Sequence, residues 1–422
     1  MVLALAYILA LSERFAVYLA TLAMNRRYAS LNGALILRGN MKYDRSTVLK
    51  SAFNLLVVFG GVLRLFDAHS AQIEPVTSFR VPAQQMAIVQ TGYGGAEVLS
   101  YQSIPVLEPA EGQVLVKVYA AAVNPVDWRN RQSIGMVAGM GGPAVIEGIA
   151  ATSVLQRVPG LDFAGVVVKV GAGVVNVTVG SPVFAKISAG QIVDLNGGYA
   201  HYALAPADKV VAKPSNLTYA EAAGLGTVGI TALRAVNQAQ VRAGQRVFIN
   251  GIAGGIGSSA AQILKARGAY VLGTASTVHH AYLKSIGVDE VIDYRQVKFE
   301  AVIQPSVDVV IETVGVDTAT RALNILKHGG TLTSVSGVPS VTQCSAAGVN
   351  CIAISGAAST GSQTEADLLL EVGRLAQSGQ LKLHVDKTFL LQEAAAAQDK
   401  NHEGNTQGKI ILIVDAIKAN QK

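Results

Sequence analysis

The sequence predicts an α/β protein in which a part made of short β-strands is followed by a doubly wound parallel sheet. Three observations support this. Runs rich in β-branched residues, separated by glycines, lie between residues 114 and 204. From Thr218 onward helix-like and strand-like segments alternate, and a glycine cluster near residue 251 joins an apolar run to one of these helices. Such alternation is typical of a parallel sheet with helices on both faces.

The composition is that of a globular protein with a large core. Half of the 422 residues are apolar and only 15% are charged, which excludes a disordered chain and allows two or three domains. The formal net charge of +6 is modest for this length. Because no basic run with interleaved aromatic residues occurs, nucleic acid is not an expected partner.

The first 83 residues differ from the rest and form an N-terminal extension. The apolar run Met1–Met24 is interrupted by Glu13 and Arg14, which argues against a clean transmembrane span. Basic residues in Met41–Lys50, the apolar run Ala52–Leu63 and small residues after it would resemble a secretory signal if translation began at Met41. An overextended start or a disordered tail explains the extension equally well. We expect a cytoplasmic protein, with export or membrane association through this extension as the alternative.

The two cysteines, Cys344 and Cys351, exclude a disulfide scaffold and a four-cysteine zinc site. Six residues separate them, so they could bridge, but two buried free thiols are the expectation. No Cys/His cluster has the spacing of a metal site, and no metal is predicted.

Four short runs between residues 114 and 204 predict the strands of the all-β part, with glycine turns between them. They are Val114–Val118, Val166–Val170, Val183–Ile187 and Tyr199–Leu204. The glycine-rich stretch Gln132–Val158 is predicted to be either a mobile loop over a pocket or a tolerated insertion.

The alternating part opens with Thr218-Tyr-Ala-Glu221, a capping box that starts a helix. Later strands are predicted at Glu290–Asp293, Val307–Ile311, Thr331–Val335, Ile352–Ser355 and Lys409–Val414, with a helix at Thr364–Ser378. Since ligands of such sheets bind outside the carboxyl ends of the strands, Glu312–Gly315 and Ser334–Gly337 are candidate cofactor-facing loops.

The glycine cluster has the form of a dinucleotide-binding turn. The apolar run Val247–Ile249 leads to Gly251, Gly254, Gly255 and Gly257, and a helix at Ser258–Arg267 and a strand at Tyr270–Leu272 follow. Glycines let the backbone approach a pyrophosphate at the helix N-terminus. Ile252 replaces the first glycine of the usual GxGxxG spacing, and glycine-rich turns also occur for packing alone.

The end of the second strand favours NADP(H). Enzymes that prefer NAD place an acid there for the ribose 2′-hydroxyl, whereas this chain has Thr274, Ala275 and Ser276 with no acid nearby. Polar or basic help could come from further residues, with ordinary surface positions as the alternative. They are His279, His280, Lys284, Tyr294 and Arg295.

Several separated motifs follow one another in order from Met86 to Asp415. They are MAIVQTGYGGAEVL at Met86, AAAVNPVDWRNRQ at Ala120, PGLDFAGVVVKVGAGV at Pro159, GGYAHYALAPADKVVAKP at Gly197, LTYAEAAGLGTVGITAL at Leu217, the glycine turn, VDEVIDYR at Val288 and QGKIILIV at Gln407. Together they resemble one family, the medium-chain dehydrogenase/reductase superfamily in its zinc-independent quinone oxidoreductase branch.

The resemblance implies a GroES-like β domain and a Rossmann domain with the active site between them, in a protein that is commonly a homodimer. The implied boundaries are 84–213 for the first part of the GroES-like catalytic domain, 214–356 for the NADP-binding Rossmann domain and 357–422 for the segment that completes the catalytic domain.

The same resemblance implies catalysis without zinc. Zinc-dependent relatives have a Cys where this chain has Asn124, a His where it has Leu161, and a Cys in the region of residues 225–227. Leucine cannot ligate a metal. Without a Lewis acid, the expected reaction is hydride transfer from NADPH to a small-molecule quinone or α,β-unsaturated carbonyl.

Candidate site residues follow from these motifs. Asn124 is the expected donor to the substrate carbonyl, supported by Asp127, although Asn-Pro-Val-Asp is also a turn sequence. Trp128, Arg131 and Tyr199 are candidates for the substrate pocket, with a core position as the alternative for Trp128. The family pattern also assigns to the cofactor the residues Thr231, Gly251, Gly254, Gly255, Gly257, Ser276, Tyr294, Gly337 and Lys409.

Two other functions stay open at this point. One is an enoyl-thioester reductase of lipid or polyketide assembly, and the other is a protein that binds NADPH without turnover.

Overall fold

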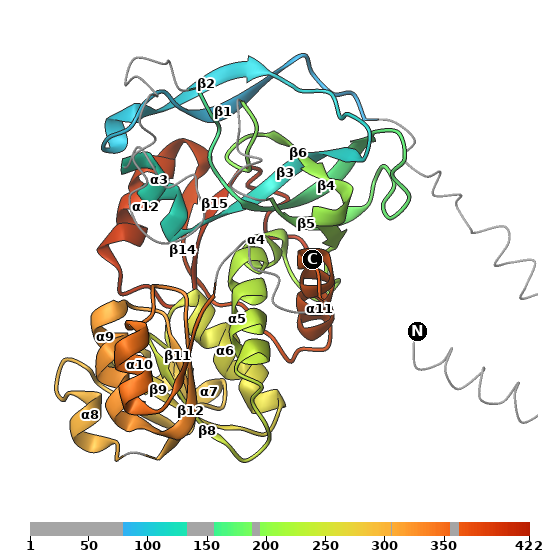
Figure 1. The fold of residues 1–422 in the computed structure, drawn as a ribbon. Helices are drawn as coiled ribbons and strands as arrows, with labels where there is room; N and C mark the ends of the chain where they lie inside the picture. The colour runs from blue at the N-terminus through green and yellow to red at the C-terminus, as the bar shows by residue number, and fades with distance from the viewer. Residues whose placement is uncertain (1–78, 133–155, 188–194, 305, 355–362) are drawn as a thin grey trace, which may run out of the picture. The chain divides into compact units, whose positions relative to one another are not determined.

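The computed structural model describes residues 79–132, 156–187, 195–304, 306–354 and 363–422 (Figure 1). The described part contains two large β-sheets and a two-stranded hairpin. The prediction of an α/β fold with an all-β part and a parallel sheet is confirmed. The N-terminal extension and most of Gln132–Val158 lie outside the described residues.

Of the two large sheets, the one that begins later in the chain is parallel. This second sheet has six strands in the order β10-β9-β8-β11-β12-β13. Figure 1 shows α9 and α10 on one side of this sheet and α5 and α6 on the other. Its strands are β8 (Arg246–Asn250), β9 (Tyr270–Thr274), β10 (Glu290–Ile292), β11 (Val307–Glu312), β12 (Leu326–Ser334) and β13 (Asn350–Ala353). Strands β8, β9 and β10 follow one another toward one edge of the sheet, and β11, β12 and β13 follow one another toward the other edge. The topological switch point therefore lies between β8 and β11.

The first large sheet has seven strands and mixes segments from both ends of the described chain. Its path is β14-β15-β3-β4-β5-β7, and β6 pairs with β3. Its strands are β3 (Gln113–Val123), β4 (Asp162–Val170), β5 (Pro182–Lys186), β6 (Tyr202–Pro206), β7 (Val210–Ala212), β14 (Val385–Leu390) and β15 (Lys409–Ile413). The hairpin is β1 (Gln84–Gln90) with β2 (Leu99–Pro105).

The helices connect and cover these sheets. They are α3 (Pro125–Gln132), α4 (Tyr219–Ala223), α5 (Gly226–Gln238), α6 (Gly255–Ala266), α7 (His280–Ser285), α8 (Phe299–Val302), α9 (Val316–Ala322), α10 (Val341–Ala347), α11 (Glu365–Gln377) and α12 (Ala394–Glu403). The capping box before α4 forms as predicted, with Thr218 and Glu221 bonding reciprocally. Among the described helices, none combines the length and hydropathy needed to cross a membrane.

One apolar cluster runs from the first sheet into the second. It includes Ala122 of β3, Leu225 and Ile230 at α5, and Ile249 of β8, all of them buried. Helix α5 can approach β4 closely because it begins with glycine. A Cβ at Gly226 would lie 2.6 Å from Asp162 Oδ1, so any side chain there would displace a buried carboxylate.

The expectation of two free thiols is wrong, because Cys344 and Cys351 form a disulfide. Helix α10 ends at Gly348, whose positive φ of 63° reverses the chain so that β13 begins two residues later. This brings the two Cα atoms to 6.2 Å, a separation that a disulfide spans.

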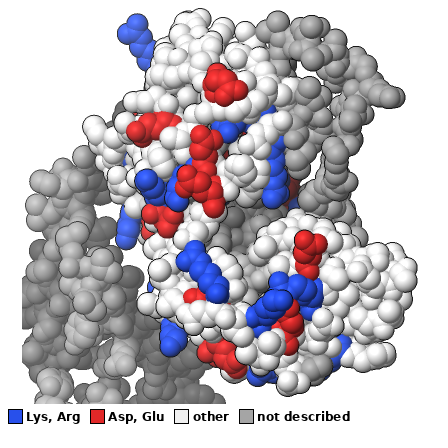
Figure 2. All heavy atoms as spheres, turned by 90° about the vertical axis from the view of Figure 1, so that its left-hand side faces the viewer, with Lys and Arg blue, Asp and Glu red and all other residues white. Residues whose placement is uncertain are grey.

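The surface of the described part carries both signs of charge. On the face in Figure 2, acidic and basic side chains lie beside one another among uncharged residues. A single-sign surface, which nucleic-acid binding would favour, does not appear on this face.

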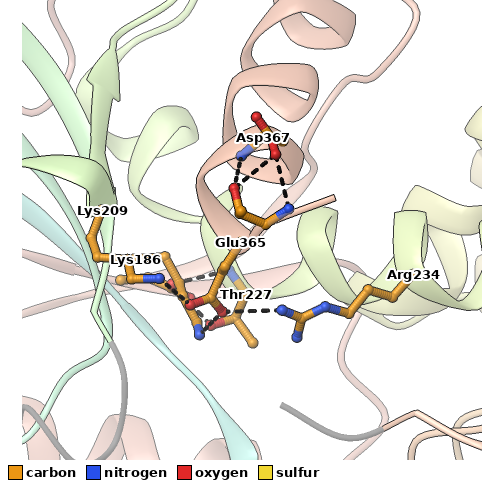
Figure 3. Close-up of polar contacts among 8 residues, drawn as sticks. Lys186, Lys209, Thr227, Arg234, Glu365 and Asp367 are labelled. Atoms are coloured by element: carbon orange, nitrogen blue, oxygen red, sulfur yellow. Dashed lines mark hydrogen bonds and ion pairs between the residues drawn. The ribbon is translucent and has the colours of Figure 1, made fainter. Parts of the chain in front are cut away.

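A cluster of charged side chains holds the N-terminal end of α11. Glu365 accepts hydrogen bonds from Lys186 at the end of β5 and, at 2.8 Å, from Lys209 before β7. Arg234 of α5 lies 3.6 Å from the same carboxylate. Figure 3 shows the three cationic side chains converging on Glu365 from different elements, with Thr227 beside them. Burial alone would raise the pKa of Glu365, but Lys186 and Lys209 lower it below its usual 4.5.

We predict that Glu365→Gln destabilises the protein by about 2–3 kcal/mol, because three cations would then face one another without their shared counter-charge. Urea unfolding measures the loss, which should shrink as salt is added. Glu371→Gln on the exposed side of the same helix is the matched control and should change stability by less than about 0.5 kcal/mol. Equal effects of the two variants would show that the cluster adds nothing.

Candidate functional site

The glycine turn between β8 and α6 leaves the first turn of the helix open to an anion. Gly251 has a φ of +74°, a conformation that favours glycine, and turns the chain away from β8. At Gly257 a Cβ would come within 2.5 Å of Gly251 O, so the helix can pack on the turn only with glycine there. Gly254 is the residue before α6 and has no side chain that could make a capping hydrogen bond. The helix N-terminus after this turn offers backbone N–H groups to an anion, and pyrophosphate binding there stays a prediction.

Lys409 lies against this turn from the other sheet. Gly408 N donates to Ala253 O at 2.9 Å, and Gly254 and Gly408 form a parallel bridge. A Cβ at Gly255 would lie 3.0 Å from Lys409 Cδ. The glycine turn and the start of β15, which sequence analysis assigned separately to the cofactor, are thus adjacent.

Asn124 and Asp127 share the start of α3. Pro125 is the first helical residue, and Asp127 Oδ2 reaches back to accept from Asn124 N at 2.8 Å. Asp127 therefore caps the N-terminal end of α3, as the turn sequence Asn-Pro-Val-Asp allows. The side chain of Asn124 is left to bond elsewhere.

That side chain joins a buried chain of hydrogen bonds that links four elements. Lys409 Nζ donates to Asn124 Oδ1 at 2.7 Å, and Asn124 Nδ2 donates to Asp162 Oδ2 at 2.9 Å. Asp162 Oδ1 accepts from the backbone N and the hydroxyl of Thr227 at 3.0 and 2.9 Å. We call Lys409, Asn124, Asp162 and Thr227 the buried polar chain. It ties β15, the residue that follows β3, β4 and the start of α5 together at one point.

Burial dominates the electrostatics here. It lowers the pKa of Lys409, an effect that Asp162 and Asp127 oppose. It raises the pKa of Asp162, against the influence of Lys409, Asn124 and Thr227. It also raises the pKa of Asp127 to about 6, although Asn124 N and Tyr199 favour the carboxylate. Lys409 Nζ donates to Val123 O and Asn124 Oδ1, while the charges of Asp162 and Asp127 favour its ammonium form through space.

The three pocket candidates are engaged in structural contacts. Trp128 donates to Asn401 Oδ1 at 3.0 Å and stacks on His402, both in α12. Arg131 is buried and pairs with Asp399 of the same helix at 2.8 Å. Tyr199 is fully buried and donates to Asp127 Oδ2 at 2.9 Å. The contacts of Trp128 and Arg131 fasten α3 to α12, and Tyr199 holds Asp127 of α3. A substrate contact for any of the three stays a prediction.

At the end of β9 several polar side chains meet one oxygen. Ser276 Oγ donates to Asn405 Oδ1 at 3.1 Å, His279 Nε2 lies 3.3 Å from the same atom, and Arg295 Nη2 approaches it to 3.4 Å. Tyr294 is more than half exposed beside Arg295. Ser276, His279 and Arg295 thus form one group.

The expectation that no acid lies near the end of β9 is wrong, because Asp293 lies beside Thr277. Asp293, one residue beyond β10, accepts from Thr277 N at 3.0 Å and from the Thr277 hydroxyl. It also accepts from Arg295 N at 2.8 Å. One oxygen of Asp293 therefore bonds to Thr277 after β9, and the other bonds to the backbone of Arg295 after β10.

The remaining cofactor candidates lie in or beside the parallel-sheet part. Thr231 is partly buried in α5, and Gly337 follows β12 with a φ of +97°. A Cβ at Gly337 would lie 2.6 Å from Val316 Cγ2, so the loop after β12 needs glycine there.

Two residues of this region were missed by sequence analysis. Asp162 directly follows Leu161, the residue that stands where zinc-dependent relatives have a histidine ligand. A charged residue within the apolar motif PGLDFAG was the available signal, since buried carboxylates need partners. Asn405 precedes the QGKI motif, and nothing in its local sequence indicates its contacts.

Comparison with known proteins gives two family matches. The alcohol dehydrogenase GroES-like domain matches residues 110–215, and the zinc-binding dehydrogenase domain matches residues 286–412. Among the described residues, no three His, Cys, Asp or Glu side chains gather as a metal site.

Individual relatives are similar over most of their length. Quinone oxidoreductase of Sus scrofa is 32% identical over 76% of this chain and 95% of its own. The chloroplastic NADPH-dependent alkenal/one oxidoreductase of Arabidopsis thaliana is 34% identical over 64% of this chain and 67% of its own. The structure of the quinone oxidoreductase from Coxiella burnetii superposes with a TM-score of 0.68 at 31% identity, covering 78% of this chain and 99% of that one.

We predict that Asp127→Asn changes how stability depends on pH. The folded-state pKa of about 6 lies above the ordinary 3.8, so the contribution of Asp127 is fully present below pH 3.8 and is lost as pH rises through 6. The variant lacks this loss. Its unfolding free energy relative to wild type should therefore rise between pH 4 and pH 7, by at most about 3 kcal/mol.

Urea unfolding at several pH values measures this difference. Asp386→Asn, at an exposed carboxylate of β14, is the control. A constant difference between Asp127→Asn and wild type over this pH range would contradict the prediction.

Proposed function

This chain belongs to the medium-chain dehydrogenase/reductase superfamily, in its quinone oxidoreductase-like branch, and is an oxidoreductase; we propose that it transfers a hydride from NADPH to a quinone or an α,β-unsaturated carbonyl compound. The names of the relatives support this class of acceptor, because they include quinone and alkenal/one reductases.

The observation that carries the proposal is the contact between the glycine turn and the buried polar chain. The uncapped start of α6 can hold the pyrophosphate of a nicotinamide cofactor through Gly254, Gly255 and the N–H groups that follow. Lys409 touches Gly255 and bonds to Asn124. Residues that would bind the cofactor and residues that would face the acceptor are therefore connected directly.

The chain's own contribution to the reaction is positioning and electrostatic stabilisation. When bound, the reduced nicotinamide supplies the hydride, which goes to the β-carbon of an enone or to a quinone. Asn124 uses one amide N–H on Asp162, which leaves the other to stabilise the acceptor oxygen as negative charge develops there. Lys409 and Asp162 hold this amide in one orientation. Water supplies the proton that completes the product.

We propose that this reaction needs no zinc. Asn124 and Leu161 stand where zinc-dependent relatives have Cys and His, and an amide already bonded to Lys409 and Asp162 is a poor metal ligand. The name of the matching family domain refers to zinc, so metal analysis of the purified protein decides this point. Stoichiometric zinc whose removal abolishes turnover would contradict it.

We propose NADPH rather than NADH on the group formed by Ser276, His279 and Arg295. Three side chains that approach one Asn405 oxygen could instead donate to an oxygen of a 2′-phosphate. Asp293, the nearby acid, is bonded to the backbone of Thr277 and Arg295.

Oligomeric state, location and domain boundaries remain proposals based on the family. They are a homodimer, the cytoplasm, and the boundaries 84–213, 214–356 and 357–422. Membrane association or export through residues 1–83 is the alternative location. N-terminal sequencing of the mature protein distinguishes a cleaved signal from a retained extension.

We predict NADPH consumption with quinones or enones as acceptors. A panel of quinones, enones and enoyl thioesters, followed by NADPH absorbance, tests the reaction class. Preferred reduction of enoyl thioesters would favour the reductase of lipid or polyketide assembly. Tight NADPH binding without reduction of any acceptor would favour a non-catalytic binding protein.

We also predict that Ser276→Asp lowers the preference for NADPH over NADH by about 10- to 100-fold, because a carboxylate would repel the 2′-phosphate. The ratio of the two dissociation constants, measured by cofactor fluorescence, is the readout. Ser285→Asp at the exposed end of α7 adds the same charge elsewhere and should leave the ratio unchanged. Tighter NADH than NADPH binding by the wild type would overturn the assignment of Ser276.

A further inference from the structure

A second buried polar network lies at the carboxyl ends of β8, β9 and β11. Asn250, Thr274 and Glu312 are the last residues of these strands, and Glu312 is paired in register with Asn250. All three side chains are buried, and Glu312 has no exposed surface. The order of connection switches between β8 and β11, so the loops that follow these two strands diverge here.

Glu312 bonds to both sides of this switch point. Its Oε1 accepts from the backbone N of Val314 at 2.6 Å and of Gly315 at 3.1 Å, in the loop after β11. Its Oε2 accepts from Asn250 Nδ2 at 3.0 Å, at the end of β8. One carboxylate thus holds together the two loops between which a ligand of this fold binds.

The acceptor oxygens of Glu312 also fix the direction of the bonds beyond Asn250. Both of them accept from N–H groups, so Asn250 presents its NH₂ to Glu312 and its oxygen to Thr274. The Thr274 hydroxyl donates to that oxygen, and Thr274 Oγ1 accepts from Gly251 N at 3.1 Å. Gly251 is the residue with positive φ that opens the glycine turn. The orientation set at Glu312 therefore reaches the backbone of the turn.

Thr313, in the loop after β11, also contacts the end of β8 and the glycine turn. The Thr313 hydroxyl donates to Asn250 O at 2.7 Å, and a Cβ at Gly251 would lie 2.6 Å from Thr313 Oγ1. The loop after β11 therefore rests directly on the glycine turn.

We propose that Glu312 is a positioning residue of the cofactor site, which joins the loop after β11 to the glycine turn through Asn250 and Thr274. This inference rests on the proposed function, since it concerns the site assigned there to the nicotinamide cofactor.

The substitution Glu312→Gln keeps the size of the side chain and breaks the pattern of donors and acceptors. If the Gln oxygen accepts from Val314 N and Gly315 N, its NH₂ meets the NH₂ of Asn250. If Asn250 then turns over, its NH₂ faces Thr274 Oγ1, and the Thr274 hydroxyl hydrogen loses Asn250 Oδ1 as its acceptor. The free protein relieves this conflict by letting the loops separate, whereas cofactor binding requires them in place. The conflict therefore appears as lost affinity.

The double variant Glu312→Gln with Asn250→Asp reverses the pair and restores the pattern. The Gln NH₂ can donate to the new carboxylate, which can also accept from Thr274, and the total charge is that of the wild type. Asp308→Asn is the matched control, because it removes a carboxylate near the amino end of the same strand, where Asp308 accepts from Arg246 N.

Two measurements test the role. The first is the NADPH dissociation constant of each variant, measured by fluorescence. The second is amide hydrogen exchange of the free proteins in segments that contain Gly251, Val314 and Gly315. We expect Glu312→Gln to weaken NADPH binding by about 5- to 100-fold and to speed exchange in both loops. The double variant should return to within about threefold of wild type, and Asp308→Asn should match wild type.

Unchanged affinity and exchange in Glu312→Gln would overturn the role of Glu312. A double variant as weak as the single one would also overturn it, because the loss would then not depend on the donor and acceptor pattern. If the wild type binds neither NADPH nor NADH, the proposed function fails first and the cofactor role of Glu312 falls with it. If the wild type binds and only the contrast between variants is missing, the role of Glu312 alone fails.

Discussion

The site depends on one buried ammonium, that of Lys409, and on the partners that this charge requires. An unpaired ammonium inside a protein is too costly to be tolerated, so carboxylates and amide oxygens must surround it. Lys409 donates to Val123 O and to Asn124 Oδ1, Asn124 links it to the Asp162 carboxylate, and Asp127 contributes a second negative charge. Because these residues come from β15, β3, β4 and the start of α3, satisfying one charge also brings these elements together beside the glycine turn.

The same requirement organises the opposite side of the glycine turn. Glu312, Asn250 and Thr274 are buried polar residues at strand ends, and each is bonded to another of the three. Backbone N–H groups of both neighbouring loops complete the bonding of the carboxylate. Satisfied buried networks of this kind specify one arrangement of the loops around them. The region proposed for the cofactor thus has two buried polar networks, and both reach the glycine turn.

How much of this follows from the sequence differs between fold and site. Periodicity and glycine spacing are local signals, and they predicted the parallel sheet, the capping box at Thr218 and the turn before α6. The bond between Asn124 and Lys409 joins residues 285 positions apart, so local pattern could not indicate it. The disulfide of Cys344 and Cys351 is a local feature, but it depends on where α10 ends and on the chain reversal at Gly348. The spacing of the two cysteines alone does not reveal this geometry.

The central claim is that a nicotinamide hydride reaches the β-carbon of an activated acceptor held near Asn124. Reduction of a simple enone with NADPH that carries deuterium at the transferred position tests this most directly. Mass spectrometry and proton NMR of the product locate the label. The account predicts one deuterium at the β-carbon of a saturated ketone. Deuterium at the carbonyl carbon of an alcohol, or an unlabelled product, would contradict it.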